Sequence, residues 1–499
     1  MELDGSTLTI ETLSALANGS AVSLSNKGLE RMTRSRAVID QVIAEKRPVY
    51  GVTTGLGAKS TQVLDHKALS DFSLQTLRGR AHAIGPEESV DHIRAGLTVR
   101  LNTLLLGFSG ARPVVAQKIA ECLNARLTPV VGQIGSIGAS DLVINATVGL
   151  ALMGEGEMIG PKGRGPSGDL MRAHGISPLD LAPRDGLALA NHTGAVAGSA
   201  ALAFAEATTA FEVAQTAAAL SMEGFRANTS PLDPRVLAAK HLPGQSGAAA
   251  GLLARLEGSR LFETGHARRL QDPLSIRNVA QIHGGVHLAL SHARPVIEGE
   301  LNGSSDNPIT LVDAHEVLSG GAYFTTELGL VCEGINRAFV QMAMAQIARI
   351  AKLLDPDFSG LSLFLAKADS GSNGFAPVMK TAEALLADLG HAAQPAVIWP
   401  SLNANGVEDC LTTAPVAARA LHRVSGLSQN LSAIELMIAA QAVDLRDGPL
   451  NLGPFLAQTY ALVRKISPML QADRPLSREI GELCAAIASG AFDLKGNTG

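Results

Sequence analysis

Apolar residues recur along the chain at helical spacing, and long stretches without helix breakers predict a mainly α-helical protein. Behind a candidate cap at Ser25, the apolar positions of residues 29–43 follow an approximate helical period, and Pro48 ends that helix. Stretches 331–354 and 411–445 keep the same period over lengths typical of a helical bundle. Stretch 194–222 is rich in alanine and interrupted by Glu206 and Glu212, so we expect a long buried helix there and not a membrane span.

A run of small residues at 135–140 leads directly into the apolar stretch 143–153. Two glycines, an alanine and two serines within six positions leave the backbone almost bare, which is typical of a tight loop that another group approaches closely. Ser140 is expected at or near the start of the following helix, where a serine often serves as the N-cap.

Composition narrows the class of protein. The 499 residues are 46% hydrophobic, 17% charged and 3% aromatic, which provides ample apolar material for a large core and allows two to four domains by length. The net charge of −5, with basic residues scattered, gives no electrostatic footprint for nucleic acid and no membrane-binding surface.

The cysteines and the N-terminus predict a cytoplasmic protein. Four cysteines lie far apart without paired spacing, so we expect reduced thiols and neither a disulfide framework nor a zinc site. The first residues lack the basic segment and apolar segment of a secretory signal. His283, His287 and His292 lie four and five residues apart on a predicted helix, but no carboxylate or cysteine accompanies them at ligand spacing, so no metal site is predicted.

Motifs in register between Tyr50 and Arg446 resemble the histidine and aromatic amino acid ammonia-lyases. In chain order they are Tyr-Gly-x-x-Thr-Gly-x-Gly at 50–57, Ala-His-Ala-Ile-Gly at 81–85, Ala-Ser-Asp-Leu at 139–142, Leu-Ala-Asn-His-Thr at 189–193, Gln-Asp-Pro-Leu-Ser-Ile-Arg at 271–277 and Asn-Gly-Val-Glu-Asp at 405–409. The resemblance implies the mainly α-helical ammonia-lyase (fumarase/aspartase-like) superfamily fold, with a long central helix bundle. It further implies an N-terminal domain at 1–190 that carries the Tyr50 and electrophile loops, and at 191–499 the central bundle with a C-terminal helical part.

In that family, Ala-Ser-Gly cyclises into the electrophile 4-methylideneimidazol-5-one (MIO), when the glycine amide nitrogen attacks the alanine carbonyl and water is lost. Here Ala139 and Ser140 are present, but the glycine is absent and Asp141 follows directly. The resemblance therefore implies an MIO formed from the Ala139-Ser140 loop, in which the attacking nitrogen would belong to Asp141. A Cβ and a carboxylate at that atom crowd the ring closure.

The resemblance also assigns catalytic and substrate-binding residues. Tyr50 takes the family's position of the base that removes the β-proton, a role that requires stabilisation of its anion. Asn191 matches the asparagine that holds the ring and the substrate; as an alternative or additional role, it caps the long helix that follows. Gln271, Leu274 and Arg277 belong to one motif, in which the family's arginine binds the substrate carboxylate. The resemblance therefore implies that Arg277 binds this group with its bidentate guanidinium. Leu274 replaces the family's tyrosine, so a hydroxyl at the reacting centre is lost.

Two residues fall on the positions that recognise the substrate's side chain. His82 stands where the histidine-specific members carry a histidine, and Glu408 stands on the other pocket position. A carboxylate opposite a histidine binds an imidazole ring by charge-assisted hydrogen bonds.

The sequence thus predicts a carbon–nitrogen lyase that eliminates ammonia from histidine or a related imidazole or aromatic amino acid. The family's members are homotetramers with active sites drawn from three chains, which implies the same assembly here. Two alternatives stay open: an aminomutase that re-adds ammonia at the β-carbon, and a divergent member without MIO that binds or transforms another small metabolite. The missing glycine and Leu274 favour the MIO-free form, whereas Tyr50, Asn191 and Arg277 favour catalysis.

Overall fold

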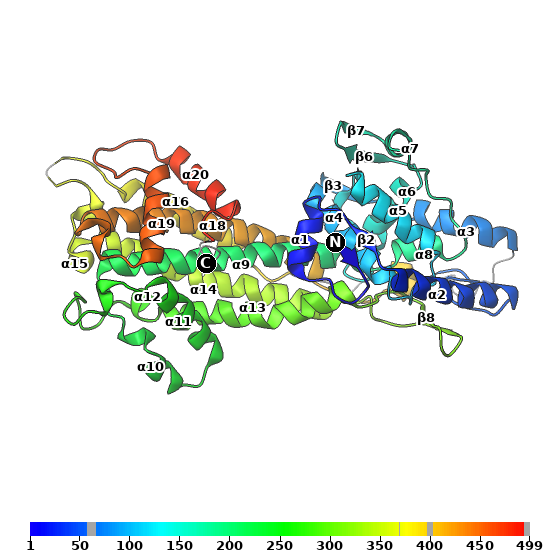
Figure 1. Ribbon diagram of the computed structural model, residues 1–499, viewed down its shortest axis with the longest axis horizontal. Helices are drawn as coiled ribbons and strands as arrows, with labels where there is room; N and C mark the ends of the chain where they lie inside the picture. Colours follow the sequence, from blue (N-terminus) through cyan, green and yellow to red (C-terminus); the bar gives the residue numbers. More distant parts are fainter. Residues whose placement is uncertain (57–65, 369, 397–402, 494–499) are drawn as a thin grey trace. The chain divides into compact units, whose positions relative to one another are not determined.

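The computed structural model describes residues 1–56, 66–368, 370–396 and 403–493, which form a mainly α-helical protein (Figure 1). The chain divides into two compact units. Unit 1 comprises Met1–Ala205, Ala293–Cys332 and Ala396–Arg419, and unit 2 comprises Glu206–His292, Glu333–Pro395 and Ala420–Gly499.

Unit 1 packs short and medium helices around a core that includes α4, α6 and α8. Its helices are α1 (Ile10–Ala17), α2 (Asn26–Ala44), α3 (His66–Arg78), α4 (Val90–Leu104), α5 (Pro113–Asn124), α6 (Leu142–Leu152), α7 (Ser167–Ala173), α8 (Asp185–Ala190) and α17 (Asn403–Gly406). The predicted cap of α2 is confirmed, because the Ser25 side chain accepts a hydrogen bond from the Gly28 amide. Helix α4 is buried over most of its length, and both α1 and α5 pack against it.

Four small sheets complete the described part of unit 1. Their strands are β1 (Glu2–Leu3), β2 (Ser23–Leu24), β3 (Ile84–Glu87), β4 (Thr128–Pro129), β5 (Gly132–Ile134), β6 (Glu157–Gly160), β7 (Gly163–Pro166), β8 (Ile309–Leu311) and β9 (Glu316–Leu318). β1 and β2 are parallel, whereas the β3–β5, β4–β6–β7 and β8–β9 pairings are antiparallel. Strand β5 runs directly into the small-residue loop at 135–140, so the β3–β5 pairing fixes where that loop begins.

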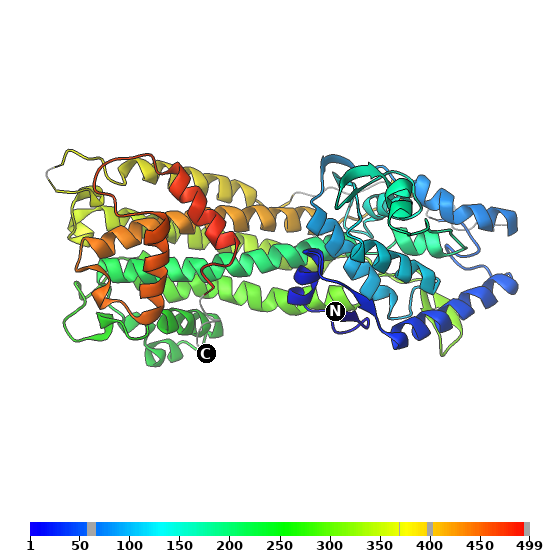
Figure 2. The same cartoon turned by 45° about the horizontal axis from the view of Figure 1, so that its top comes forward.

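Unit 2 is a bundle of long helices with shorter ones around it. Its helices include most of α9 (Gly194–Phe225), α13 (Val279–Asn302), α14 (Thr326–Leu354) and α18 (Ala414–Asp444), together with α10 (Pro234–Ala238), α11 (Pro243–Arg255), α12 (Leu274–Arg277), α15 (Pro356–Ser359), α16 (Ala376–Ala392), α19 (Pro454–Ile466) and α20 (Ser477–Ala488). Figures 1 and 2 both show α9, α13, α14 and α18 running alongside one another. The long helices predicted from the sequence are therefore confirmed.

A buried ion pair joins three of these long helices. Arg349 of α14 donates from Nε to Glu435 Oε1 of α18 at 2.7 Å and from Nη2 to Oε2 at 3.1 Å, with both side chains fully buried. Ser221 of α9 donates to the same carboxylate at 2.9 Å. Arg349 also donates to the carbonyl oxygen of Ser275 at 3.3 Å, which ties α12 to the bundle.

Helix α9 is long and apolar enough, by length and composition, to cross a membrane, and it belongs to the candidate segment Asp185–Phe225. The most apolar window of that segment is 89% buried inside the protein, which is typical of the core helix of a soluble protein. All four cysteines are free: Cys122 and Cys332 are buried, Cys484 is half-buried and Cys410 is exposed.

Candidate active site

The small-residue loop is fixed by backbone hydrogen bonds to a distant segment of unit 1. Ala139 forms an isolated antiparallel bridge with Phe324. Its neighbour Ser140 donates its amide to the Tyr323 carbonyl oxygen at 3.1 Å. Thr325 donates its amide to Gly138 O at 3.2 Å and its hydroxyl to the same oxygen at 2.9 Å. The loop therefore has a defined conformation in spite of its small side chains.

Gly138 is required by the close approach of a second segment. It has φ +76°, and a Cβ at this position would lie 1.8 Å from Thr412 Oγ1. The Thr412 amide donates to Ile137 O at 3.0 Å, so a backbone hydrogen bond holds Thr412 against the loop. Only glycine combines this left-handed backbone with the space that Thr412 occupies.

Ser140 contacts Asn191, the first link between two predicted site residues. The Ser140 hydroxyl donates to Asn191 Oδ1, and both side chains are buried. Asn191 Nδ2 in turn donates to Asn307 O at 2.7 Å, which fixes the orientation of the amide. The alternative role of Asn191 as cap of the long helix is wrong: Asn191 follows the last residue of α8, and α9 begins only at Gly194.

The N-terminus of α9 is capped by Asp141 instead. Asp141 Oδ2 accepts a hydrogen bond from the Val196 amide at 2.9 Å, and Oδ1 accepts one from the Ser136 hydroxyl. Burial raises the pKa of Asp141 to about 6, although both hydrogen bonds oppose the shift. Asp141 thus connects the loop and the start of α6 to the first turn of α9.

A buried charge cluster holds the segment that positions Asn191. Asp306 accepts two hydrogen bonds from Arg100, at 3.0 and 2.9 Å, and lies 3.4 Å from Arg184 Nη2. Arg184 also donates to Pro308 O at 2.9 Å. These fully buried contacts on both sides of Asn307 fix the carbonyl oxygen that binds Asn191, because a bidentate arginine–carboxylate pair has little rotational freedom.

Tyr50 and Glu408 lie close enough to Arg80 and Tyr323 to shift the pKa values of these two side chains. Burial lowers the pKa of Arg80, while the negative charges of Tyr50 and Glu408 raise it. Burial raises the pKa of Tyr323, and the same two residues raise it further. Tyr50, Arg80, Tyr323 and Glu408 therefore form one electrostatic group in unit 1, which we call the phenol cluster. All four are half-buried.

The other predicted binding residues lie outside this cluster. His82 is exposed, and its amide donates to Arg80 O at 2.8 Å. Arg277 lies at the end of α12 in unit 2 and donates to the exposed Gln271. Leu274 begins that helix with 64% of its surface exposed. The geometry joins Gln271 to Arg277, and the pairing of His82 with Glu408 stays a prediction.

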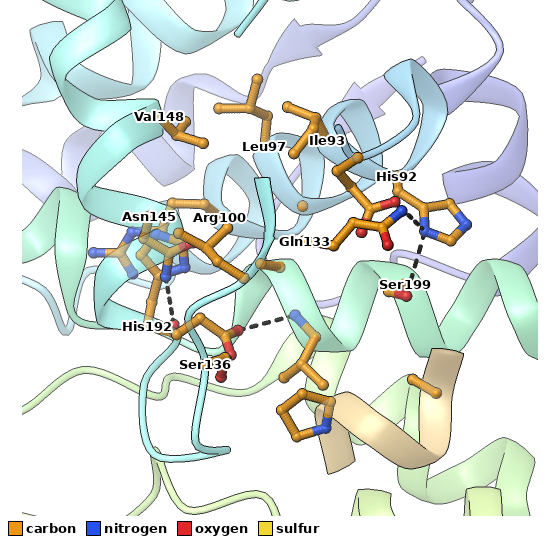
Figure 3. Close-up of a pocket in the computed structure, with 18 of the residues that line it drawn as sticks. His92, Ile93, Leu97, Arg100, Gln133, Ser136, Asn145, Val148, His192 and Ser199 are labelled. Carbon is orange, nitrogen blue, oxygen red and sulfur yellow. Dashed lines mark hydrogen bonds and ion pairs between the residues drawn. The ribbon is translucent and has the colours of Figure 1, made fainter. Parts of the chain in front are cut away.

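A pocket beside the loop is lined by Asp141 and by Ser136, which Figure 3 labels. Ile93, Leu97 and Val148 form part of its apolar wall, and at its polar end His92 lies 3.4 Å from both Glu88 and Ser199. Of the predicted site residues, Asp141 alone lines it. In the described part of the chain, no group of three or more histidine, cysteine or acidic side chains has an arrangement suited to a metal ion.

This fold and loop geometry define the class of protein. Residues 8–465 match the aromatic amino acid lyase family, and the chain belongs to it. The chain is therefore a carbon–nitrogen lyase of the ammonia-lyase type. It is 32% identical to the histidine ammonia-lyase of Myxococcus xanthus over 98% of each chain, and 34% identical to that of Geobacillus thermodenitrificans over 96% of this chain and 95% of the relative.

Solved structures of related enzymes have the same fold. An ergothioneine-degrading enzyme from Treponema denticola superimposes with a TM-score of 0.93 at 27% identity, covering 99% of both chains. Histidine ammonia-lyase from Trypanosoma cruzi gives 0.91 at 28% identity, covering 98% of this chain and 94% of that one. The tyrosine aminomutase of Streptomyces globisporus gives 0.92 at 29% identity, covering 99% and 97%.

The histidine ammonia-lyase family uses MIO, which forms from three consecutive residues of the protein chain itself. Ala139 and Ser140 supply two of its three residues. The third is Asp141, at φ +23°, with a buried carboxylate held by Ser136 and Val196. An amide nitrogen that closes the ring must move toward the Ala139 carbonyl carbon, whereas these contacts and the start of α6 hold Asp141 in place. The residues do not fit the ring as the family builds it.

Two members of the phenol cluster, Arg80 and Tyr323, were not predicted from the sequence. Arg80 lies two residues before His82, outside the motif. Tyr323 follows a Ser-Gly-Gly turn at 319–321 and is one of only three tyrosines in the chain. The scarcity of tyrosine was the available signal for Tyr323.

Proposed function

We propose that the chain eliminates the amine from an α-amino acid with an imidazole side chain, histidine being the reference substrate. The observation that carries the proposal is the contact of Ser140 with Asn191, which joins the family's loop serine to the family's substrate-holding asparagine. Full-length similarity to histidine ammonia-lyases supports the imidazole assignment.

The residues divide the work of an elimination. Tyr50 removes the proton from the β-carbon, the electron pair of that C–H bond forms the Cα–Cβ double bond, and the C–N bond breaks with departure of the amine. Arg277, held by Gln271, binds the substrate carboxylate. Glu408 and His82 recognise the imidazole. Together these contacts would hold the substrate with its β-carbon at Tyr50 before the C–N bond breaks.

The leaving group decides between two forms of this function. Ammonia is a poor leaving group, and in the family MIO activates it; here that electrophile would come from Ala139 and Ser140, with Asp141 supplying the last nitrogen. In the second form no electrophile is made, and the substrate carries a quaternary ammonium that departs as a neutral tertiary amine. The missing glycine favours this second form, and a relative that degrades ergothioneine is consistent with it.

Intact mass and product analysis separate the two forms. Cyclisation removes two waters from the chain, and Ser140→Ala removes the only source of the exocyclic methylene in this loop. The purified protein is incubated with histidine and with its trimethylammonium betaine, while ammonia, trimethylamine and the imidazole acrylate are measured. Loss of two waters with ammonia release establishes the first form; unchanged mass with trimethylamine release establishes the second. A β-amino acid product would instead indicate the aminomutase, and no product from either substrate refutes the imidazole assignment.

Repair of the loop provides the matched variant. A glycine inserted between Ser140 and Asp141 restores the family's tripeptide. If the aspartate blocks closure, this variant loses two waters and its ammonia release appears or rises. A folded variant with unchanged mass and unchanged activity would show that the obstacle lies elsewhere, with Leu274 as the next residue to test.

The assembly that we propose is the family's homotetramer with shared sites, in the cytoplasm. Tyr50 and Arg277 would then be supplied to each site by different chains. Tyr50→Phe and Arg277→Met are each expected to be inactive, and subunit exchange between them should restore part of the activity. Light scattering gives the oligomeric state; a monomer, or mixtures that stay inactive after proven exchange, would refute shared sites.

A further inference from the structure

Tyr323 is the residue of the phenol cluster that the elimination does not yet use. Its carbonyl oxygen accepts the Ser140 amide at 3.1 Å, and its neighbour Phe324 bridges Ala139. The backbone of Tyr323 is thus bonded to Ser140, and the next residue lies opposite Ala139, so Tyr323 is held beside the two loop residues at which the chemistry is expected. Its position cannot shift without breaking the loop contacts.

Among the described residues, the Tyr323 hydroxyl has no hydrogen-bond partner, and the side chain is half-buried. The third tyrosine, Tyr460 of unit 2, differs, because its hydroxyl donates to Asp444. A half-buried phenol with no partner in the described part of the chain retains its capacity to donate to a bound molecule.

The environment of Tyr323 suits a donor and not a base. Burial raises its pKa, and the nearby charges of Tyr50 and Glu408 raise it further, so the phenol keeps its proton at neutral pH. Two neighbouring phenols cannot both ionise easily, since like charges repel. A phenol whose pKa is raised stays protonated and can donate while a second group acts as the base.

We propose that Tyr323 is a hydrogen-bond donor to the reacting centre of the substrate and supplies the hydroxyl that Leu274 removes. Tyr50 takes the β-proton, while Tyr323 keeps its own proton throughout and donates to the negative charge that develops on the substrate. No bond to Tyr323 forms or breaks. The proposal rests on the proposed function, because it assigns a role in the same elimination.

The first test removes only the hydroxyl. In Tyr323→Phe we expect kcat to fall about 100-fold, at the lower end of the range for loss of one donor to a developing charge, with KM changed less than about threefold. Affinity for the imidazole acrylate product should be retained, which separates loss of a donor from loss of the fold. The matched control Tyr460→Phe should keep the kcat of the parent.

The pH profile and a rescue variant distinguish a donor from a structural residue. At high pH the parent should lose activity as Tyr323 ionises, and this basic limb should flatten in Tyr323→Phe. Adding Leu274→Tyr to that variant should restore kcat at least several-fold. An unchanged kcat, an unchanged basic limb, or the absence of rescue would overturn the proposal while leaving the imidazole lyase function intact.

A third measurement does not need activity. Tyrosinate absorbance is titrated in the parent, in Tyr50→Phe and in Tyr460→Phe. Because the charge of Tyr50 raises the pKa of Tyr323, ionisation of Tyr323 should move to lower pH in Tyr50→Phe and should not move in Tyr460→Phe. No movement in Tyr50→Phe would refute the coupling on which the donor role depends, even if the lyase function is correct.

Discussion

Asp141→Asn should make the protein more stable at pH 8 and leave its stability almost unchanged at pH 4. The carboxylate is buried, and its pKa is raised from the usual 3.8 to about 6. Because one pKa unit corresponds to about 1.4 kcal/mol, holding the charge in the folded protein costs about 3 kcal/mol. Asparagine keeps an oxygen for the Val196 amide and an amide group for Ser136 without this cost.

The direction of the pH dependence follows from the raised pKa. The protonated acid is favoured in the folded state, so its contribution to stability is fully present below pH 3.8 and is lost as the pH rises through about 6. The difference in unfolding free energy between variant and parent should therefore grow by about 3 kcal/mol between pH 4 and pH 8. Burial and the charge of Asp141 both raise the pKa of Glu300, to about 7, so Asp141→Asn also relieves this repulsion and the difference includes it.

Urea unfolding at several pH values, at one fixed protein concentration, measures this difference. Asp169→Asn is the control, because Asp169 is exposed in a surface pair with Arg172 and should contribute less than about 1 kcal/mol at any pH. A variant that is destabilised equally at pH 4 and pH 8 would refute the reasoning, since it would show that the cap geometry matters and the buried charge does not.

Three further variants test other parts of the structure. Glu408→Gln should weaken the binding of imidazole substrates by about 1.5–3 kcal/mol, tenfold or more, and that of phenylalanine far less; equal losses in calorimetry would contradict the imidazole assignment. Gly138→Ala should displace the loop and abolish activity, because its Cβ would lie 1.8 Å from Thr412 Oγ1; full activity would show that the loop adapts. Arg349→Met should cost about 3–5 kcal/mol of unfolding free energy by leaving Glu435 buried without its partner, and Arg349→Met with Glu435→Leu should recover much of it.

The long helices could be predicted from the sequence because local pattern and tertiary packing agree there. Stretch 331–354 lies within α14, and stretch 411–445 covers α18 almost end to end. The strands were not predicted, since they are two to four residues long and too short to display an alternating pattern. The start of α6 was predicted to within two residues of Ser140, because small residues before an apolar run mark a loop that meets a helix.

Candidate site residues could be named from the sequence only where a motif carries them. Tyr50, Ser140 and Asn191 follow from resemblance, but the cap of α9 did not, because its acceptor comes from Asp141, 55 residues earlier in the chain. Local sequence indicates a cap only when the acceptor lies beside the helix in sequence. The phenol cluster likewise depends on Arg80, Tyr323 and Glu408 meeting in space, which no spacing in the sequence reveals.

The contact between Gly138 and Thr412 has a consequence for the order in which the protein is made. Its two residues lie 274 positions apart. At synthesis rates of about 5–20 residues per second, roughly 14 to 55 s pass between them. During that time the loop lacks both Thr412 and, for most of it, the 323–325 segment that fixes its backbone. The active-site loop is therefore a late product of biosynthesis, and a nascent chain that ends before residue 412 contains every atom of Ala139 and Ser140 without the conformation that makes them a site.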